Sequence, residues 1–317
     1  MGLIWFISVP IALFLIRKYR ERSWGYYTSN KSQKNKVFIV TGPTSGLGKE
    51  TVKELVARDA KVIMACRDLG KAKEVIREIR EKIICGELIP MELDLCSFNS
   101  IRNFSEEVTK NFPQINVLIN NAGVYVPHEK KQLTKDGHEI HFGVNHLGHF
   151  LLTNLLLDKL KESAPSRIVV VSSKLHESGI IDFDNLQGDK GFRKGFRNPA
   201  YNNSKLANVY FCKELAKKLP DGVETYSLCP GFCWTGLFRN SNMKWYQYLL
   251  FAPVAFLYMR SARQGCQTIL YCALSDEVIG KSGKMFRDCK LFSSSHNFDD
   301  EIQKKLWAVS ESLTKIK

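Results

Sequence analysis

"TGPTSGLGKE", Thr41 to Glu50, follows the apolar run Val37–Val40 and leads into a stretch with helical periodicity. Three glycines therefore lie in the turn between a predicted strand and a predicted helix. Gly42 permits a tight turn, Gly46 lets the backbone approach a pyrophosphate, and Gly48 allows close packing of helix on strand. A glycine-spaced turn is a weak indicator by itself, so its ligand has to be inferred from the rest of the chain.

Short β-branched runs alternate with longer amphipathic stretches from Lys36 onward. Continuous apolar strands separated by helices predict a parallel sheet that is covered on both faces. The predicted strands are Val37–Val40, Lys61–Ala65, Leu88–Glu92, Val117–Ile119, Arg167–Val171 and Glu224–Leu228, and helices are predicted at Lys49–Ala57, Lys71–Lys82 and Ile101–Asn111. We expect a single doubly wound (Rossmann-type) α/β domain, which binds ligands beyond the carboxyl ends of its strands.

Composition narrows the classes of function. The chain has 317 residues, of which 44% are hydrophobic and 25% charged, enough for one large core. Its net charge of +14 could suggest nucleic acid, but the basic residues are spread out and no nucleic-acid motif accompanies them. The nine cysteines are scattered without a CxxC pair, which favours free thiols over disulfides or a zinc site.

The N-terminal stretch differs from the rest. Gly2–Ile16 carries no charge and is followed at once by the basic cluster Arg17–Arg22. As a helix it would be about 22 Å long, shorter than the roughly 30 Å hydrocarbon core, so it could span with help from flanking aromatic residues or insert partly. A cleaved signal peptide has its basic residues before the apolar run, not after it. We expect a retained membrane anchor over residues 1–22, with the cluster facing the cytosol and anionic lipid.

Further motifs occur in strand order along the chain. They are "NNAG" (Asn120–Gly123), "GVNHLGHF" with Asn145, "VVVSS" ending at Ser172–Ser173, "YNNSK" with Tyr201 and Lys205, and "CPG" with Pro230–Gly231. Tyr201 and Lys205 are four residues apart and would share one face of a helix.

In this order the motifs resemble the short-chain dehydrogenase/reductase family, over about Lys36 to Cys289. Within it, the chain most resembles the membrane-anchored retinol dehydrogenases. That resemblance is carried by "ACRD" (Ala65–Asp68), "NHLGHFLLTNLLL" (Asn145–Leu157), "SKLANV" (Ser204–Val209) and "SGKMFRDCK" (Ser282–Lys290). It implies a catalytic domain over residues 36–290, followed by a C-terminal tail at 291–317.

The implied activity is NADP(H)-dependent interconversion of a lipophilic aldehyde or ketone and its alcohol, most simply all-trans-retinal and retinol, with reduction favoured. A sterol, a farnesoid or a lipid aldehyde would be handled by the same chemistry. A catalytically silent cofactor-binding membrane scaffold and a basic membrane-surface adaptor are the alternatives from other classes. Neither would need Tyr201 and Lys205 at this spacing.

The resemblance assigns a role to each catalytic candidate. Tyr201 would exchange a proton with the substrate oxygen, and Ser173 would bind that oxygen. A free tyrosine titrates near a pKa of about 10, so we expect the charge of Lys205, with that of the oxidised nicotinamide, to lower the pKa of Tyr201. Lys205 would also hold the nicotinamide ribose, and Asn145 a water of the proton relay. The insertion between Ser173 and Tyr201 is polar and glycine-rich, which predicts a surface excursion beside the site.

The residues after the second predicted strand bear on cofactor choice. An NAD enzyme usually has an acidic residue there for the ribose 2′-hydroxyl. Here Cys66 is neutral and Arg67 suits the 2′-phosphate of NADP, whereas Asp68 argues mildly for NAD unless it caps the next helix. Asp94 would contact the adenine. The resemblance completes the cofactor set with Thr44, Ser45, Leu47, Leu95, Asn121, Ala122, Gly123, Pro230, Gly231 and Thr235.

Two stretches are open to more than one interpretation. His138, His141, His146 and His149 have the spacing of paired metal ligands, but we interpret them as structural and expect no metal. The apolar stretch Met243–Met259 is interpreted as a substrate lid that touches the bilayer, with a buried helical hairpin as the alternative. We expect the endoplasmic reticulum membrane with the catalytic domain in the cytosol. A mitochondrial membrane is less favoured, and a homodimer is left open.

Overall fold

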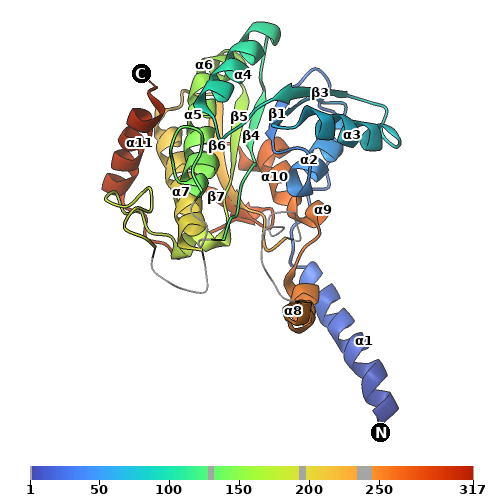
Figure 1. Cartoon of the computed structure of the whole chain (residues 1–317). Helices are drawn as coiled ribbons and strands as arrows, with labels where there is room; N and C mark the ends of the chain where they lie inside the picture. The colour runs from blue at the N-terminus through green and yellow to red at the C-terminus, as the bar shows by residue number, and fades with distance from the viewer. Residues whose placement is uncertain (1, 128–131, 193–197, 234–244, 317) are drawn as a thin grey trace.

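An eight-stranded sheet forms the centre of the protein (Figure 1). The computed structural model describes residues 2–127, 132–192, 198–233 and 245–316. The strand order is β3-β2-β1-β4-β5-β6-β7-β8, parallel throughout except that β8 pairs antiparallel with β7. The strands are β1 Val37–Thr41, β2 Lys61–Cys66, β3 Glu87–Glu92, β4 Val117–Asn120, β5 Ser166–Val171, β6 Val223–Cys229, β7 Met285–Arg287 and β8 Lys290–Leu291.

The six predicted strands are confirmed, each end lying within one residue of its prediction. All five residues of β1 are buried because helices cover both faces of the sheet. Val37 and Ile39 belong to the core on one face, and Phe38 and Val40 to the core on the other. This double burial explains why the strand is apolar at every position instead of alternating.

Helices lie on both sides of the sheet (Figure 1). One layer holds α2 (Gly46–Val56), α3 (Leu69–Arg80) and α10 (Gln267–Leu274), and the other holds α4 (Phe98–Asn111), the π-helical η1 (Phe142–Leu147), α5 (Gly148–Leu155), α7 (Pro199–Lys218) and α11 (Asp300–Thr314). The shorter segments are α6 (Leu157–Glu162), η2 (Lys174–Ser178), α9 (Ala262–Gly265) and η4 (Asp276–Val278). The order of strands reverses between β1 and β4, so a crevice for ligands is expected at their carboxyl ends.

Two segments pack more closely onto the domain than their sequences indicate. The segment expected to be a C-terminal tail contains α11, whose buried Trp307 stacks on Phe211. The insertion after Ser173 is only partly a surface excursion, because Ile181 and Phe183 pack against the core of α7 and α11. Both segments therefore stabilise the helix that carries Tyr201.

The helix α1 (Gly2–Glu21) projects from the domain and contacts α8 (Trp245–Tyr258) near its C-terminal end (Figure 1). Arg17 joins the two helices, since its guanidinium donates to the carbonyl oxygens of Phe256 and, at 2.6 Å, Met259. Within the described ranges we find no helix whose length and apolar character suffice for a membrane crossing.

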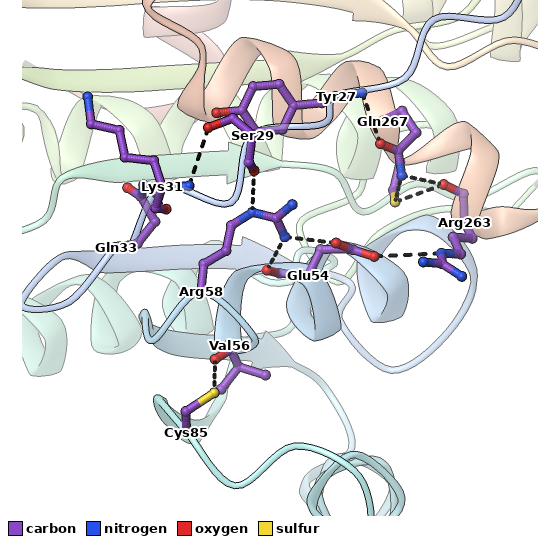
Figure 2. Close-up of polar contacts among 11 residues, drawn as sticks. Tyr27, Ser29, Lys31, Gln33, Glu54, Val56, Arg58, Cys85, Arg263 and Gln267 are labelled. Atoms are coloured by element: carbon purple, nitrogen blue, oxygen red, sulfur yellow. Dashed lines mark hydrogen bonds and ion pairs between the residues drawn. The ribbon is translucent and has the colours of Figure 1, made fainter.

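The segment after α1 is fixed to the domain. Figure 2 shows Arg58 donating through Nε to the carbonyl oxygen of Ser29 at 3.0 Å, and the Tyr27 N–H donating to Gln267 Oε1 at 3.2 Å. Arg58 is itself held by an ion pair of 2.8 Å with Glu54 on α2. The chain between α1 and β1 is thus attached to the α/β domain by Arg58, which follows α2, and by Gln267 of α10.

Candidate active site

The glycine turn between β1 and α2 forms a cradle. Gly42 and Gly46 have φ angles of +66° and +53°, in the region that favours glycine. A Cβ atom on Gly48 would lie 2.1 Å from the carbonyl oxygen of Gly42. Ser45, at the N-cap of α2, makes no side-chain capping bond, and Thr44 precedes it in the turn. The N–H groups of the first turn of α2 are therefore suited to a phosphate, and the cradle fits a dinucleotide.

Thr41 joins this cradle to the strand β4. Its buried hydroxyl oxygen accepts the N–H groups of Asn121 and Ala122, both at 2.9 Å, and lies 3.0 Å from His149 Nε2. His149 Nδ1 donates to the carbonyl oxygen of Asn145 at 3.0 Å, so Nδ1 carries the proton and Nε2 accepts from Thr41. Burial lowers the pKa of His149 to about 4, which keeps the ring neutral. The roles of Thr41 and His149 were not predicted from the sequence.

Asn145 lies in the centre of the site, on η1. Its Oδ1 accepts the Val124 N–H at 2.8 Å, and its Nδ2 donates to Ser204 Oγ at 3.0 Å and to the Val124 carbonyl at 3.2 Å. The side chain is thus engaged in holding the segment after the NNAG motif. Gly123 lies beside the Asn145 side chain. A Cβ atom on Gly123 would lie 3.4 Å from Asn145 Oδ1 and 3.5 Å from Lys205 Nζ.

Tyr201, Lys205 and Ser173 come together at the carboxyl end of β5. Tyr201 and Lys205 lie on α7 and are 5% and 3% exposed. Lys205 Nζ is 5.6 Å from the centre of the Tyr201 ring and donates to the Val171 carbonyl at 3.1 Å. Ser173 lies close enough to Tyr201 to lower the pKa of its phenol, whereas the buried Ser172 donates to the Lys205 carbonyl at 2.7 Å. Of the two serines, Ser173 is the one placed beside the phenol.

The electrostatics of this cluster differ from the expectation. Burial raises the pKa of Tyr201 well above its ordinary value, and the nearby Ser173 hydroxyl offsets this only in part. Burial also lowers the pKa of Lys205 to about 8. The protein groups by themselves therefore do not produce the expected lowering of the Tyr201 pKa, because desolvation dominates. A neutral phenol is the form that can donate a proton to a carbonyl oxygen.

The end of β2 carries the residues on which cofactor choice is expected to depend. Cys66 is buried and Arg67 is exposed. Asp68 Oδ1 accepts the Lys71 N–H at 2.9 Å and so caps α3, which is the alternative role that the sequence allowed for it. Asp94 lies nearby and pairs with Lys135 at 2.9 Å.

Asp94 stands among positive charges. Burial would raise its pKa, but the hydrogen bonds from Lys135 and the Cys96 N–H, with the charges of Lys135 and Arg67, lower it overall. Sequence reasoning missed Lys135, because nothing in its neighbourhood marks it as close to Asp94. Leu95, which follows, is buried and lies against Gly148.

The remaining predicted cofactor residues are only partly described. Gly231 has a φ of +86°, and a Cβ on it would lie 2.6 Å from Nε of the buried Arg260. Arg260 pairs with Asp288 at 2.5 Å and thus holds the Pro230–Gly231 turn against β7. Thr235 and the first residues of the predicted lid, 243 and 244, lie outside the described residues.

The four histidines do not converge. His138 bonds Gln187, His141 bonds Glu139, His146 bonds Ser310 and His149 bonds Thr41. In the part of the chain that the structure describes, we find no cluster of His, Cys, Asp or Glu able to hold a metal ion.

Comparison with known proteins gives consistent results. A family described as short chain dehydrogenase matches residues 36–245. Retinol dehydrogenase 11 of Mus musculus is 45% identical over 314 residues, covering 98% of this chain and 96% of the relative. Retinol dehydrogenase 14 of Homo sapiens is 45% identical over 294 residues, covering 87% and 85%. The crystal structure of an uncharacterized protein from Mycobacterium Paratuberculosis superposes with a TM-score of 0.67 at 31% identity, covering 90% of this chain and 95% of that one.

Proposed function

The chain belongs to the short-chain dehydrogenase family, in its retinol dehydrogenase branch, and we propose that it uses NADP(H) to reduce retinal or a similar lipophilic aldehyde. One observation carries the proposal. Ser173, Tyr201 and Lys205 lie together beside a glycine cradle, in a chain that matches a retinol dehydrogenase over 98% of its length.

The chemistry needs a hydride at the carbonyl carbon and a proton at the oxygen. A bound nicotinamide would supply the hydride. Ser173 and Tyr201 would hold the carbonyl oxygen, and Tyr201 would then donate its phenolic proton to it. The phenol is protonated at neutral pH, which is the form that donation to a carbonyl oxygen requires. Lys205 would hold the ribose and, once a phenolate forms, stabilise it through its charge.

Cofactor selectivity is proposed to rest on Arg67. Its guanidinium would bind the 2′-phosphate of NADP, while Asp68 is engaged in capping α3. Asp94 would contact the adenine, with Lys135 beside it. Gly42, Gly46 and Gly48 would admit the pyrophosphate to the start of α2.

We propose further that α1 and α8 form a membrane-binding unit, over residues 1–22 and the lid. The exposed large apolar side chains of these two helices support it: Ile11, Phe14, Leu15, Ile16 and Tyr19 on α1, with Val254, Phe256 and Tyr258 on α8. Arg17 joins the two helices, so they would contact lipid as one unit. We propose that a substrate dissolved in lipid reaches the site beneath α8. The endoplasmic reticulum, with the domain in the cytosol, is the proposed location, and 36–290 the proposed catalytic unit.

The test uses microsomes that express the chain, NADPH, and a panel of retinoid, sterol, farnesoid and aliphatic aldehydes. We expect NADPH-dependent formation of retinol at the highest kcat/KM of the panel. Binding of NADPH without turnover of any aldehyde would instead support the silent scaffold. Turnover confined to the sterols or aliphatic aldehydes would overturn the retinoid assignment and leave the reaction class intact.

A further inference from the structure

The three residues after the NNAG motif, Val124–Val126, are held by side chains on both sides of Tyr125. Val124 is bonded through both backbone groups by Asn145. The Val126 N–H donates to His141 Nε2 at 3.0 Å, and the Val126 carbonyl accepts from Asn198 Nδ2 at 2.6 Å. This segment, which we call the clamp segment, is therefore fixed at each end.

His141 is fixed in turn by Glu139. The two side chains are 2% and 5% exposed, and His141 Nδ1 lies 2.6 Å from Glu139 Oε1. A backbone N–H can only donate, so Nε2 of His141 accepts from Val126 and Nδ1 carries the proton that is donated to Glu139. The second carboxyl oxygen of Glu139 accepts the Phe142 N–H at 2.8 Å, at the start of η1. Both ring nitrogens of His141 are therefore engaged, and neither can exchange protons with a substrate.

Two routes lead from this pair to Tyr201. Through hydrogen bonds, the Val126 carbonyl holds Asn198, whose Oδ1 accepts the Tyr201 N–H at 3.2 Å and caps α7. Through ring contacts, the Tyr201 ring lies edge-on to His141, with centroids 6.1 Å apart, and to Tyr125, with centroids 5.2 Å apart. The rotation of the phenol and the first turn of its helix are thus set by the same pair of side chains.

We propose that Glu139 and His141 are positioning residues, which hold the clamp segment and the start of α7 so that the Tyr201 hydroxyl points at the substrate oxygen. The inference rests on the proposed function, because it assigns the pair to proton transfer by Tyr201. A small misplacement of a catalytic group is costly, since proton transfer requires hydrogen-bond distance to the reacting atom.

Three substitutions test the contributions of the two hydrogen bonds of His141 separately. His141→Gln keeps an acceptor near the position of Nε2, for Val126. His141→Asn keeps a donor near the position of Nδ1, for Glu139. His141→Phe keeps the ring and removes both bonds. His138→Phe is the matched control, because the side-chain hydrogen bond that the structure gives His138 goes to Gln187 and not to the clamp segment.

We expect His141→Phe and His141→Asn to lower kcat by about tenfold or more, equivalent to about 1.4 kcal/mol in the barrier, with little change in KM for NADPH. His141→Gln should restore most of kcat, and His138→Phe should have less than a twofold effect. The inference would be overturned by equal kcat values for His141→Gln and His141→Asn, or by a loss confined to KM. These two polar variants keep the test decisive if His141→Phe does not fold.

Hydrogen exchange separates this inference from the proposed function. The amide of Val126 should exchange faster in His141→Asn than in the wild type and stay protected in His141→Gln, whatever the substrate is. Unchanged protection in His141→Asn would refute the clamp even in an active enzyme. Wild-type protein without reductase activity would refute the proposed function and leave the exchange result to stand by itself.

Discussion

Replacing Arg67 with alanine should weaken NADPH far more than NADH. Arg67 directly follows β2 and is exposed, and it stands close enough to Asp94 to lower the pKa of that carboxyl. The guanidinium is proposed to contact the 2′-phosphate, which NADH lacks. The substitution therefore removes a favourable interaction with one cofactor and leaves the other nearly unaffected.

The size of the effect follows from the exposure of Arg67. A charge-assisted hydrogen bond contributes about 1.5–3 kcal/mol, and water and salt weaken it at an exposed site. We therefore take the low end, which is about tenfold in KM for NADPH, against less than twofold for NADH. The same reasoning predicts that added salt narrows the wild-type preference for NADPH and hardly alters that of the variant.

The assay measures initial rates of aldehyde reduction with each cofactor at saturating substrate. Arg77→Ala is the matched control, because it removes an exposed positive charge from α3, two turns beyond the proposed phosphate site. It should leave both KM values within twofold. Equal increases in KM for NADPH and NADH in Arg67→Ala would remove Arg67 from the phosphate site and favour NAD.

Two further predictions concern stability and orientation. Thr41→Val leaves the partly buried N–H of Ala122 without its acceptor, while the N–H of Asn121 keeps the Ile119 carbonyl, so we expect Tm to fall by roughly 2–5 °C in differential scanning fluorimetry. Thr109→Val on the exposed face of α4 should be nearly neutral, and equal Tm values for the two variants would contradict the Thr41 network. In sealed microsomes, added protease should digest the domain, and the exposed N-glycosylation sequons at Asn30 and Asn103 should carry no glycan. A domain that is protected from protease and glycosylated would instead lie in the lumen.

The sequence predicted the parallel strands because burial on both faces makes them apolar at every position. It did not predict β7 and β8, which are three and two residues long. Their turn uses Asp288 and Cys289 at positive φ, where no glycine or asparagine signals it. Short strands at a sheet edge are specified by the tertiary structure, not by a local pattern.

The residues of the site also divide into those that a local pattern predicts and those that only the tertiary structure brings together. Tyr201 and Lys205 were predicted because both lie on one helix, where their spacing is meaningful. Thr41 and His149 are 108 residues apart, and no spacing rule joins them. The histidine at 141 was noted, but its partners Glu139 and Val126 are defined only by the fold. Contacts of this kind arise when the carboxyl ends of separate strands meet at one edge of a sheet.

The most direct measurement follows a deuterium atom from cofactor to product. NADPH that carries deuterium at the transferable position is incubated with all-trans-retinal and either wild-type enzyme or Tyr201→Phe, and the retinol is analysed by mass spectrometry. We predict labelled retinol from the wild type, and at most a few per cent of that rate from Tyr201→Phe, whose NADPH affinity should be retained. Retinol formation by Tyr201→Phe at a rate near that of the wild type would contradict proton donation by Tyr201.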